Sequence, residues 1–114
     1  MRDERADAVI GMEEPLLLTH GQRIAGVAAA ARLPTLFVRD LADSGPLLAF
    51  GTSLVAAARA AAGLIDRVIK GARPGDLPFE IVRWPELVGN LRVARAVDLT
   101  IPPEVLSRAN QLVE

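Results

Sequence analysis

The chain has 114 residues, of which 51% are hydrophobic and 24% are charged, and its formal net charge is −1. This length allows one domain with a real core. The near-neutral charge argues against a nucleic-acid binder, which needs a basic stripe to displace phosphate counterions. The absence of cysteine excludes disulfides and thiolate metal sites. Because the mean hydropathy of +0.30 is high for a small domain, we expect part of the apolar surface to face other protein.

The amino-terminal part of the sequence predicts a strand, a helix and a second strand. Residues 6–12 are apolar enough for a strand buried on both faces. Thr19 is the predicted N-cap of a helix over 21–32, with Gln22 completing a capping-box pattern. Residues 35–38 supply the next strand. A strand, helix and strand within this length form a βαβ unit, whose two strands are parallel.

A second helix is the clearest element of the sequence. A short extended segment at 47–50 ends at Gly51, and Thr52 or Ser53 can cap a helix that runs to about Lys70. Gly71 stands where a left-handed C-cap is wanted. One apolar face of this helix consists of Leu54, Ala57, Ala58, Ala61, Ile65, Val68 and Ile69.

The carboxyl-terminal part predicts further strands and helices. Strands are expected at 79–84 and 86–88, on either side of Pro85. Asn90 can cap a third helix through about Val97, and a final helix is expected over 103–112 because proline is favoured in a first turn. The elements together predict the α/β class.

Side chains that could support catalysis or metal binding are few. His20 is the only histidine, which excludes His-pair zinc sites, and we interpret it as a solvated side chain. No serine lies in a G-x-S-x-G motif. The N–H groups of residues 51–53 could bind an anion at a helix start, but no G-x-G-x-x-G motif or P-loop lysine accompanies them. We therefore expect no catalytic residue, no metal and no cofactor.

Charged residues follow the first two predicted strands. Glu13 and Glu14 come after the first strand and Arg39 after the second. The carboxyl ends of parallel strands are where open α/β sheets bind ligands, so the carboxylates could receive an ammonium or a hydroxyl group. A solvated loop explains both carboxylates and Arg39 equally well. A hydrolase or isomerase that uses Glu13 and Glu14 as acid and base ranks last, because no partner orients a base.

Five stretches of the sequence resemble substrate-binding proteins of ABC transporters, of the type that includes tryptophan and tyrosine receptors. The likeness is to the carboxyl-terminal third of such receptors and covers nearly the whole chain. The most specific stretch is Ile69-Lys70-Gly71-Ala72-Arg73-Pro74-Gly75-Asp76-Leu77-Pro78. The others are Ala6–Ile10 with Glu14-Pro15, Arg23-Ile24 with Arg32-Leu33-Pro34, Leu47–Gly51, and Glu86–Leu91 through Ala94 and Ala96 to Leu99–Pro102.

The resemblance implies part of a type I periplasmic-binding fold, in which two α/β lobes joined by three crossing strands enclose the ligand. The chain would supply a βαβ unit with parallel strands, a hinge-crossing strand and three further helices. Residues 1–45 and 79–114 would belong to the carboxyl-terminal lobe. Residues 46–51 would form a hinge crossing, and residues 52–71 a helix of the other lobe, which would here lack the sheet that it covers.

The resemblance also implies ligand contacts at Glu14, Phe50, Gly51 and Thr52. Glu14 stands where the family usually has aspartate, and Phe50 where it has tyrosine, so the longer carboxylate can still reach a ligand while the hydroxyl is lost. Asp98 occupies a helix-ending position where the family has glycine, and a left-handed residue there would be slightly strained.

The function that the resemblance implies is a non-enzymatic receptor, or a fragment of one, that captures a small organic solute such as an amino acid. Its partners would be the solute and, through the full receptor, an ABC permease. The family location is periplasmic, although the first residues lack the apolar region of a secretory signal, so the chain expressed as given would be cytoplasmic. The alternative is a self-standing α/β interaction or sensor domain that forms a homodimer through the helix at 53–70.

Overall fold

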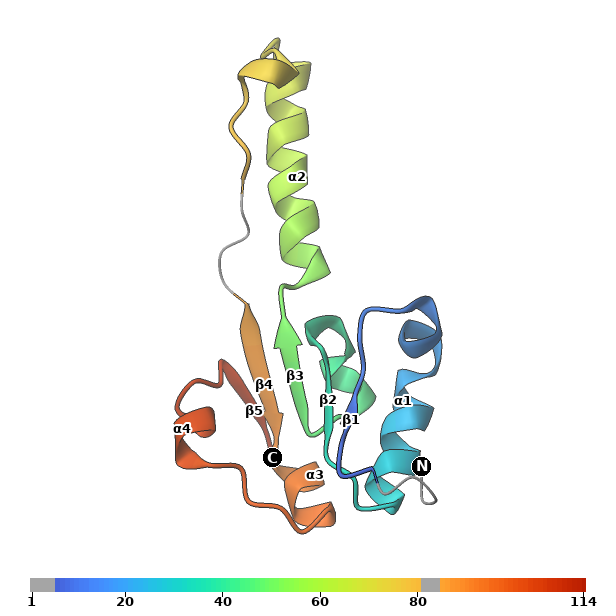
Figure 1. The fold of residues 1–114 in the computed structure, drawn as a ribbon. Helices are drawn as coiled ribbons and strands as arrows, with labels where there is room; N and C mark the ends of the chain where they lie inside the picture. The colour runs from blue at the N-terminus through green and yellow to red at the C-terminus, as the bar shows by residue number, and fades with distance from the viewer. Residues whose placement is uncertain (1–5, 81–84) are drawn as a thin grey trace.

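The computed structural model describes residues 6–80 and 85–114, which form one five-stranded sheet, helices packed against its faces and one long helix that projects from its edge (Figure 1). The strands lie side by side in the sheet in the same order as in the chain: β1 (Val9–Ile10), β2 (Thr35–Val38), β3 (Leu48–Gly51), β4 (Glu86–Asn90) and β5 (Gln111–Val113). The first three strands are parallel, β4 is antiparallel to β3, and β5 is parallel to β4. The predicted α/β class is therefore confirmed.

The predicted βαβ unit is present, but its helix begins earlier than expected. Helix α1 (Pro15–Ala30) has Glu14 as its N-cap and proline at its first position, where the missing N–H costs nothing. The prediction of Thr19 as N-cap was wrong. Thr19 lies inside the helix, and its hydroxyl donates to the Pro15 carbonyl at 2.9 Å. The preceding strand is also shorter than predicted, since only Val9 and Ile10 pair with β2.

One face of the sheet carries the main core. Phe37 of β2 is 1% exposed and lies in a buried cluster with Leu17 and Ala25 of α1. Leu41, from the 3₁₀ helix η1 (Arg39–Ser44), completes the cluster. The strand predicted at 35–38 has the bounds expected for it. Its buried Thr35 hydroxyl accepts a hydrogen bond at 2.8 Å from the Leu47 N–H, which fixes the turn into β3.

The opposite face of β3 and β4 is covered by the segment after β4. Helix α3 (Leu91–Ala96) is capped as predicted, because the Asn90 side chain accepts from the Val93 N–H at 3.1 Å. Ile101 lies over Leu48 and Gly89 and belongs to a second buried cluster with Leu47 and Ala94. Asp98, which follows α3, has the left-handed conformation expected of it, with φ +58°.

The predicted helix over 103–112 was wrong in its second half. Helix α4 spans only Pro103–Leu106, and β5 follows it. The chain enters β5 at this point because Asn110 makes two hydrogen bonds to β4. Its N–H donates to the Leu87 carbonyl, and its side-chain oxygen accepts from the Leu87 N–H, both at 2.8 Å. This long-range pairing outweighs the local helix preference and aligns β5 beside β4.

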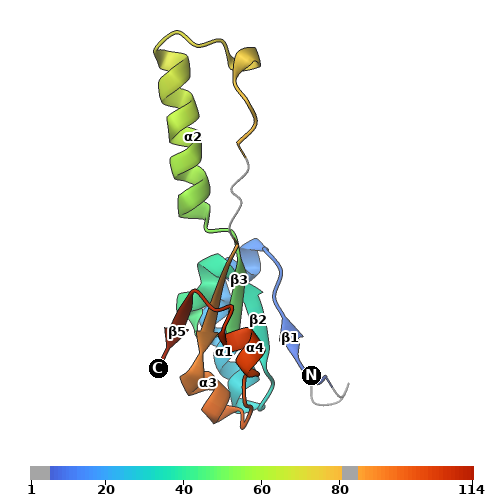
Figure 2. The ribbon, with the colours of Figure 1, turned by 90° about the vertical axis from the view of Figure 1, so that its left-hand side faces the viewer.

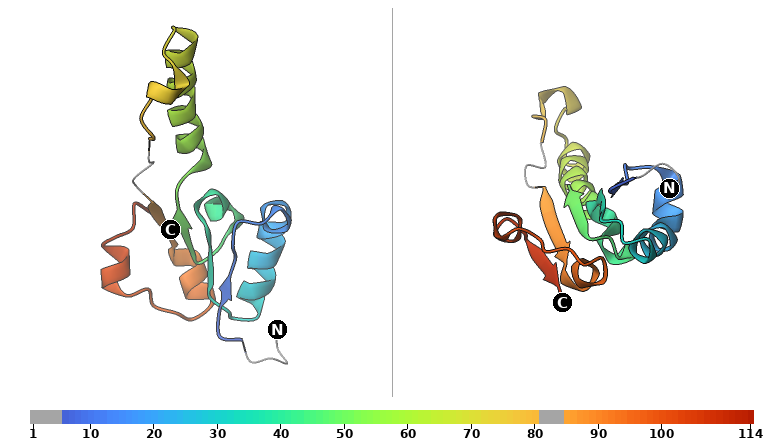
Figure 3. Two further views of the ribbon diagram at one scale, coloured as in Figure 1. Left: turned by 45° about the horizontal axis from the view of Figure 1, so that its top comes forward. Right: turned by 60° about the horizontal axis from the view of Figure 1, so that its bottom comes forward.

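Helix α2 (Leu54–Ile69) extends away from the sheet (Figures 1 and 2), and Figure 3 shows the same protrusion from two further directions. Ser53 caps it by accepting from the Ala56 N–H at 3.4 Å, and Gly71 ends it with φ +102°, both as predicted. The molecule measures 57 × 31 × 20 Å, with a radius of gyration of 17.7 Å. A compact chain of this length would have about 13 Å, so the protrusion of α2 sets the shape. No helix in the described ranges is long and apolar enough to cross a membrane.

The chain returns from α2 to the sheet through the short 3₁₀ helix η2 (Pro74–Asp76). Of the strand predicted at 79–84, Phe79 and Glu80 are not in a strand, and the remainder lies outside the described residues. The strand expected at 86–88 is confirmed and extends to Asn90. The strand expected at 47–50 is displaced by one residue, to Leu48–Gly51.

Candidate ligand site at the carboxyl edge of the sheet

The carboxyl ends of β1, β2 and β3 meet at one edge of the sheet, the edge from which α2 departs (Figure 1). Beyond β1 lies Glu14 at the start of α1, and beyond β2 lies Arg39 at the start of η1. Beyond β3 the chain enters α2 through Thr52 and Ser53. Ligands of open α/β sheets bind outside the carboxyl ends of the strands. Glu14, Phe50, Gly51 and Thr52, the four residues predicted to contact a ligand, all lie at this edge.

The predicted residues are accessible there. Glu14 and Thr52 are exposed, and the Glu14 carboxylate makes no capping hydrogen bond to its own helix. Phe50 is 47% exposed, whereas its neighbour Ala49, whose side chain points to the other face, is 1% exposed. An accessible ring and a carboxylate without a capping bond are groups that can contact an organic ammonium ion.

Gly51 lies where β3 leaves the sheet. Its φ of +141° is a conformation that side-chain-bearing residues rarely adopt. A Cβ built on Gly51 would lie 3.7 Å from the Arg39 backbone nitrogen, which is an ordinary contact. Backbone conformation, and not crowding, therefore makes glycine necessary at this point.

Two contacts at this edge were missed from the sequence. The Arg39 Nε donates to Glu86 Oε2 at 2.6 Å, and both side chains are partly buried. The Asp40 carboxylate accepts from the Leu54 N–H, at 3.1 Å to one oxygen and 3.0 Å to the other. The position of Arg39 after a parallel strand was visible in the sequence. Its partner Glu86 was not, because the antiparallel pairing of β4 with β3 is a long-range event.

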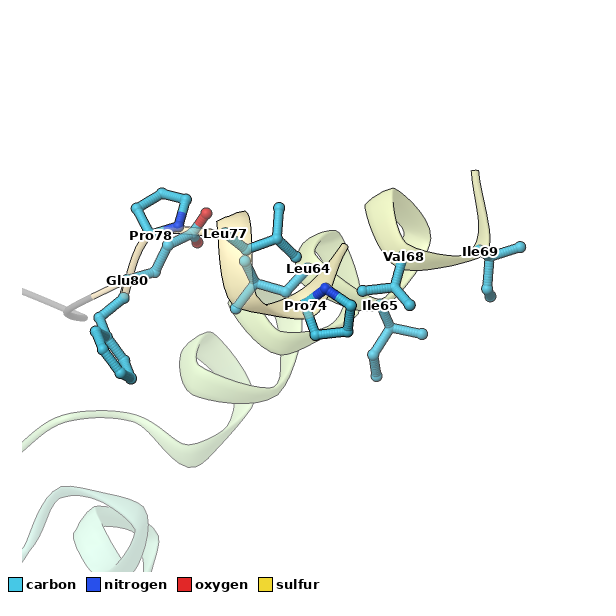
Figure 4. A pocket seen from close by; sticks show the side chains of 9 residues that line it. Leu64, Ile65, Val68, Ile69, Pro74, Leu77, Pro78 and Glu80 are labelled. Atoms are coloured by element: carbon cyan, nitrogen blue, oxygen red, sulfur yellow. The ribbon is translucent and has the colours of Figure 1, made fainter. Parts of the chain in front are cut away.

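Two hollows formed by described residues lie away from this edge. One, of about 460 Å³, lies between α2 and residues 74–80, through which the chain returns toward the sheet, and is apolar (Figure 4). The other, of about 270 Å³, lies between α3 and α4. The first is lined by Leu64, Ile65, Val68, Ile69, Pro74, Leu77, Pro78, Phe79 and Glu80. Neither hollow includes a predicted ligand residue, and neither gathers the convergent polar groups that orient a small ligand.

Residues 6–80 and 85–114 contain no group of three side chains able to hold a metal ion. His20 is exposed on α1. The edge presents a carboxylate at Glu14, an aromatic ring at Phe50 and the N–H groups at the end of β3.

Solved structures show the same fold. The chain is similar to a conserved domain protein from Vibrio cholerae O1 biovar El Tor, with a TM-score of 0.82 and 21% identity, over 96% of this chain and 37% of that one. It is also similar to an ABC domain from Streptococcus pneumoniae in complex with L-Trp, with a TM-score of 0.81 and 21% identity. That match covers 98% of this chain and 38% of that one. The chain thus spans little more than a third of the length of either.

The family model described as ABC transporter substrate binding protein matches residues 3–113. No curated protein matches the chain. The family match covers nearly the whole sequence and agrees with the fold. The chain therefore belongs to the family of ABC transporter substrate-binding proteins.

Proposed function

We propose that the chain is the carboxyl-terminal part of a receptor that captures a small organic solute, such as an amino acid, for an ABC importer outside the cytoplasm. Residues 1–45 and 79–114 would belong to one lobe, 46–51 would form a hinge crossing, and 52–71 would supply a helix of the other lobe. The permease would be engaged by the full receptor. Closure of the lobes on the solute would stabilise the bound state by differential affinity.

The observation that carries this proposal is the placement of α2. It has no buried residue and departs from the edge where Glu14, Phe50, Gly51 and Thr52 lie. A solute at this edge would therefore contact the sheet on one side and face α2 and the segment after it (residues 54–80, here called the α2 unit) on the other. Because the similar pneumococcal domain is in complex with L-Trp, amino acids are the first solutes to test.

Because these 114 residues would supply only one wall of the proposed cleft, we expect them to bind weakly, in the millimolar range, equivalent to about 4 kcal/mol. Backbone amide NMR of the 12.1 kDa chain, titrated with a panel of amino acids that includes L-Trp, measures binding of this strength. We expect one class of solute to shift the amides of residues 11–14 and 50–53. Shifts confined to residues 64–80, or no shift with any amino acid, would contradict the proposal.

Substitutions separate the proposed site from nonspecific binding. Phe50→Ala and Glu14→Gln should each weaken the titration by roughly tenfold, because each removes one apolar or charged contact. Glu104→Gln is the matched control, since Glu104 is an exposed carboxylate on α4, away from this edge.

A second candidate is the self-standing domain that dimerises through α2. The apolar hollow beside α2 favours it, because Ile65, Ile69 and Phe79 are exposed there. An obligate dimer would bury this surface. Sedimentation equilibrium at micromolar concentration should then show a dimer that Ile65→Lys abolishes, while Arg59→Ala on the same helix leaves it intact. A monomeric parent chain would exclude this candidate.

A further inference from the structure

The chain leaves the sheet from β3 into α2 (the outgoing crossing) and re-enters it at β4 (the returning crossing). We infer that Arg39 and Asp40 form a clamp on both crossings, and that this clamp sets the angle between the sheet and the α2 unit. The inference rests on the proposed function, because it makes the clamp a control of lobe closure. It depends on two contacts, both from consecutive residues at the carboxyl end of β2. One contact acts on the outgoing crossing and the other on the returning crossing.

Asp40 holds the outgoing crossing. Its carboxylate accepts the N–H of Leu54, the first residue of α2, with both oxygens within 3.1 Å. That N–H is one of those at the start of a helix that have no partner within the helix, and the N-terminus of this 16-residue helix favours negative charge. Ser53 already caps the helix locally. Asp40 therefore adds a bond between the helix and the sheet, and not only a cap.

Arg39 holds the returning crossing. Its Nε lies 2.6 Å from an oxygen of Glu86, the first residue of β4. The arginine and glutamate side chains are 23% and 39% exposed, so water screens the pair only in part. Glu86 pairs with Gly51 in the last rung of the β3–β4 ladder. The ion pair thus joins the end of β2 to the start of β4, beside the point where the chain leaves β3 after Gly51.

The strength of these contacts suits a hinge. A partly exposed ion pair and one charge-assisted hydrogen bond contribute little to folding, but each can change an equilibrium between two orientations by roughly tenfold. A solute that binds one orientation more tightly could override such a clamp. Gly51, whose backbone tolerates unusual conformations, lies between the two contacts and allows the movement.

The test measures the distance between α1 and α2 by pulsed electron spin resonance. The chain has no native cysteine, so Gln22→Cys and Arg59→Cys introduce one spin label on the exposed surface of each helix. We expect one narrow distance distribution in this labelled chain. Asp40→Ala and Arg39→Met should each broaden it or add a second population. Asp43→Ala, which removes another carboxylate of the same η1, should leave it unchanged.

A charge exchange adds a readout that a structural role alone would not give. Arg39→Glu should broaden the distribution, and the addition of Glu86→Arg should narrow it again. A broad distribution in the labelled parent, or superimposable distributions for the parent, Asp40→Ala and Arg39→Met, would overturn the inference. If Asp40→Ala lacks a cooperative unfolding transition, the charge exchange and the labelled parent in molar sodium chloride decide the question.

This experiment uses no solute, so its result is independent of the NMR titration. A clamp without any solute binding would overturn the proposed function and leave the clamp standing. If solute binds at residues 11–14 and 50–53, but Asp40→Ala and Arg39→Met give the same distance distribution as the labelled parent, only the clamp would be overturned. A narrow parent distribution that shifts when the solute is added would support both.

Discussion

Phe37→Ala is expected to lower the free energy of unfolding by about 3–5 kcal/mol, the largest effect that we expect of any single substitution. Phe37 is 1% exposed and lies in the cluster that joins β2, α1 and η1. The substitution removes the ring from the centre of this cluster and leaves a cavity that the surrounding helices can only partly fill. Because domains are stable by only about 5–15 kcal/mol, much of this chain's stability would be lost.

Urea unfolding followed by far-UV circular dichroism measures this change. Phe79→Ala is the matched control, because the chain contains a phenylalanine there that is fully exposed. We expect the control to leave the free energy of unfolding within about 0.5 kcal/mol of the parent. Equal values for Phe37→Ala and Phe79→Ala would show that the β2–α1 cluster does not contribute to the stability of the chain.

Gly51→Ala is expected to destabilise the chain by about 1–3 kcal/mol through backbone strain. The glycine has φ +141°, and the nearest atoms to an added Cβ would lie at 3.7 and 3.8 Å, so the new methyl group itself fits. If the alanine moves to a relaxed conformation instead, the exit from β3 must turn and α2 must point elsewhere.

Gly63→Ala is the control for this substitution. Gly63 lies inside α2, with nothing within 4 Å of an added Cβ, so alanine should stabilise the helix by up to about 1 kcal/mol. Thermal unfolding of the two variants should therefore shift in opposite directions. If Gly51→Ala raised the unfolding temperature as Gly63→Ala does, the left-handed conformation of Gly51 would not be required.

The elements that could be predicted from the sequence are those with local causes. Helix α2 carries its own cap at Ser53 and its own left-handed terminator at Gly71, and both act as expected. The βαβ unit follows from two apolar strands separated by one helix. Asn90 caps α3 within three residues of its own position. Each of these features has its main cause within one helix or between elements that are neighbours in the chain.

The elements that could not be predicted depend on long-range pairing. Residues 107–112 have no strong helix terminator, yet Asn110 pairs with Leu87 and converts the segment to a strand. Thr19 has a typical capping side chain but lies within α1, because Pro15 and the apolar Leu17 extend the helix toward the amino terminus. The burial of Leu17, which favours the earlier helix start over a cap at Thr19, depends on tertiary packing and could not be predicted from the local sequence.

The same division holds for the candidate site. Its edge was predictable, because the carboxyl ends of parallel strands share one edge, and Glu14 and Arg39 follow such strands. Its organisation was not, since Glu86 and Leu54 reach Arg39 and Asp40 only through the pairing of β4 with β3 and the direction in which α2 departs. The roles of Glu14, Phe50, Gly51 and Thr52 in binding remain predictions from the resemblance.

The β3–β4 ladder has a consequence for how such a protein can be divided. Its rungs run from Leu48–Gly89 to Gly51–Glu86, as in the two arms of a hairpin, so residues 52–85 occupy the place of the hairpin loop. The entropy of closing a loop grows slowly with its length, by about 0.6 kcal/mol for each doubling. A two-residue Asn-Gly turn could therefore replace the whole segment between β3 and β4, and every strand would keep its neighbours in the sheet. We therefore expect the five-stranded sheet to fold without the segment between β3 and β4, and to accept a different segment in its place.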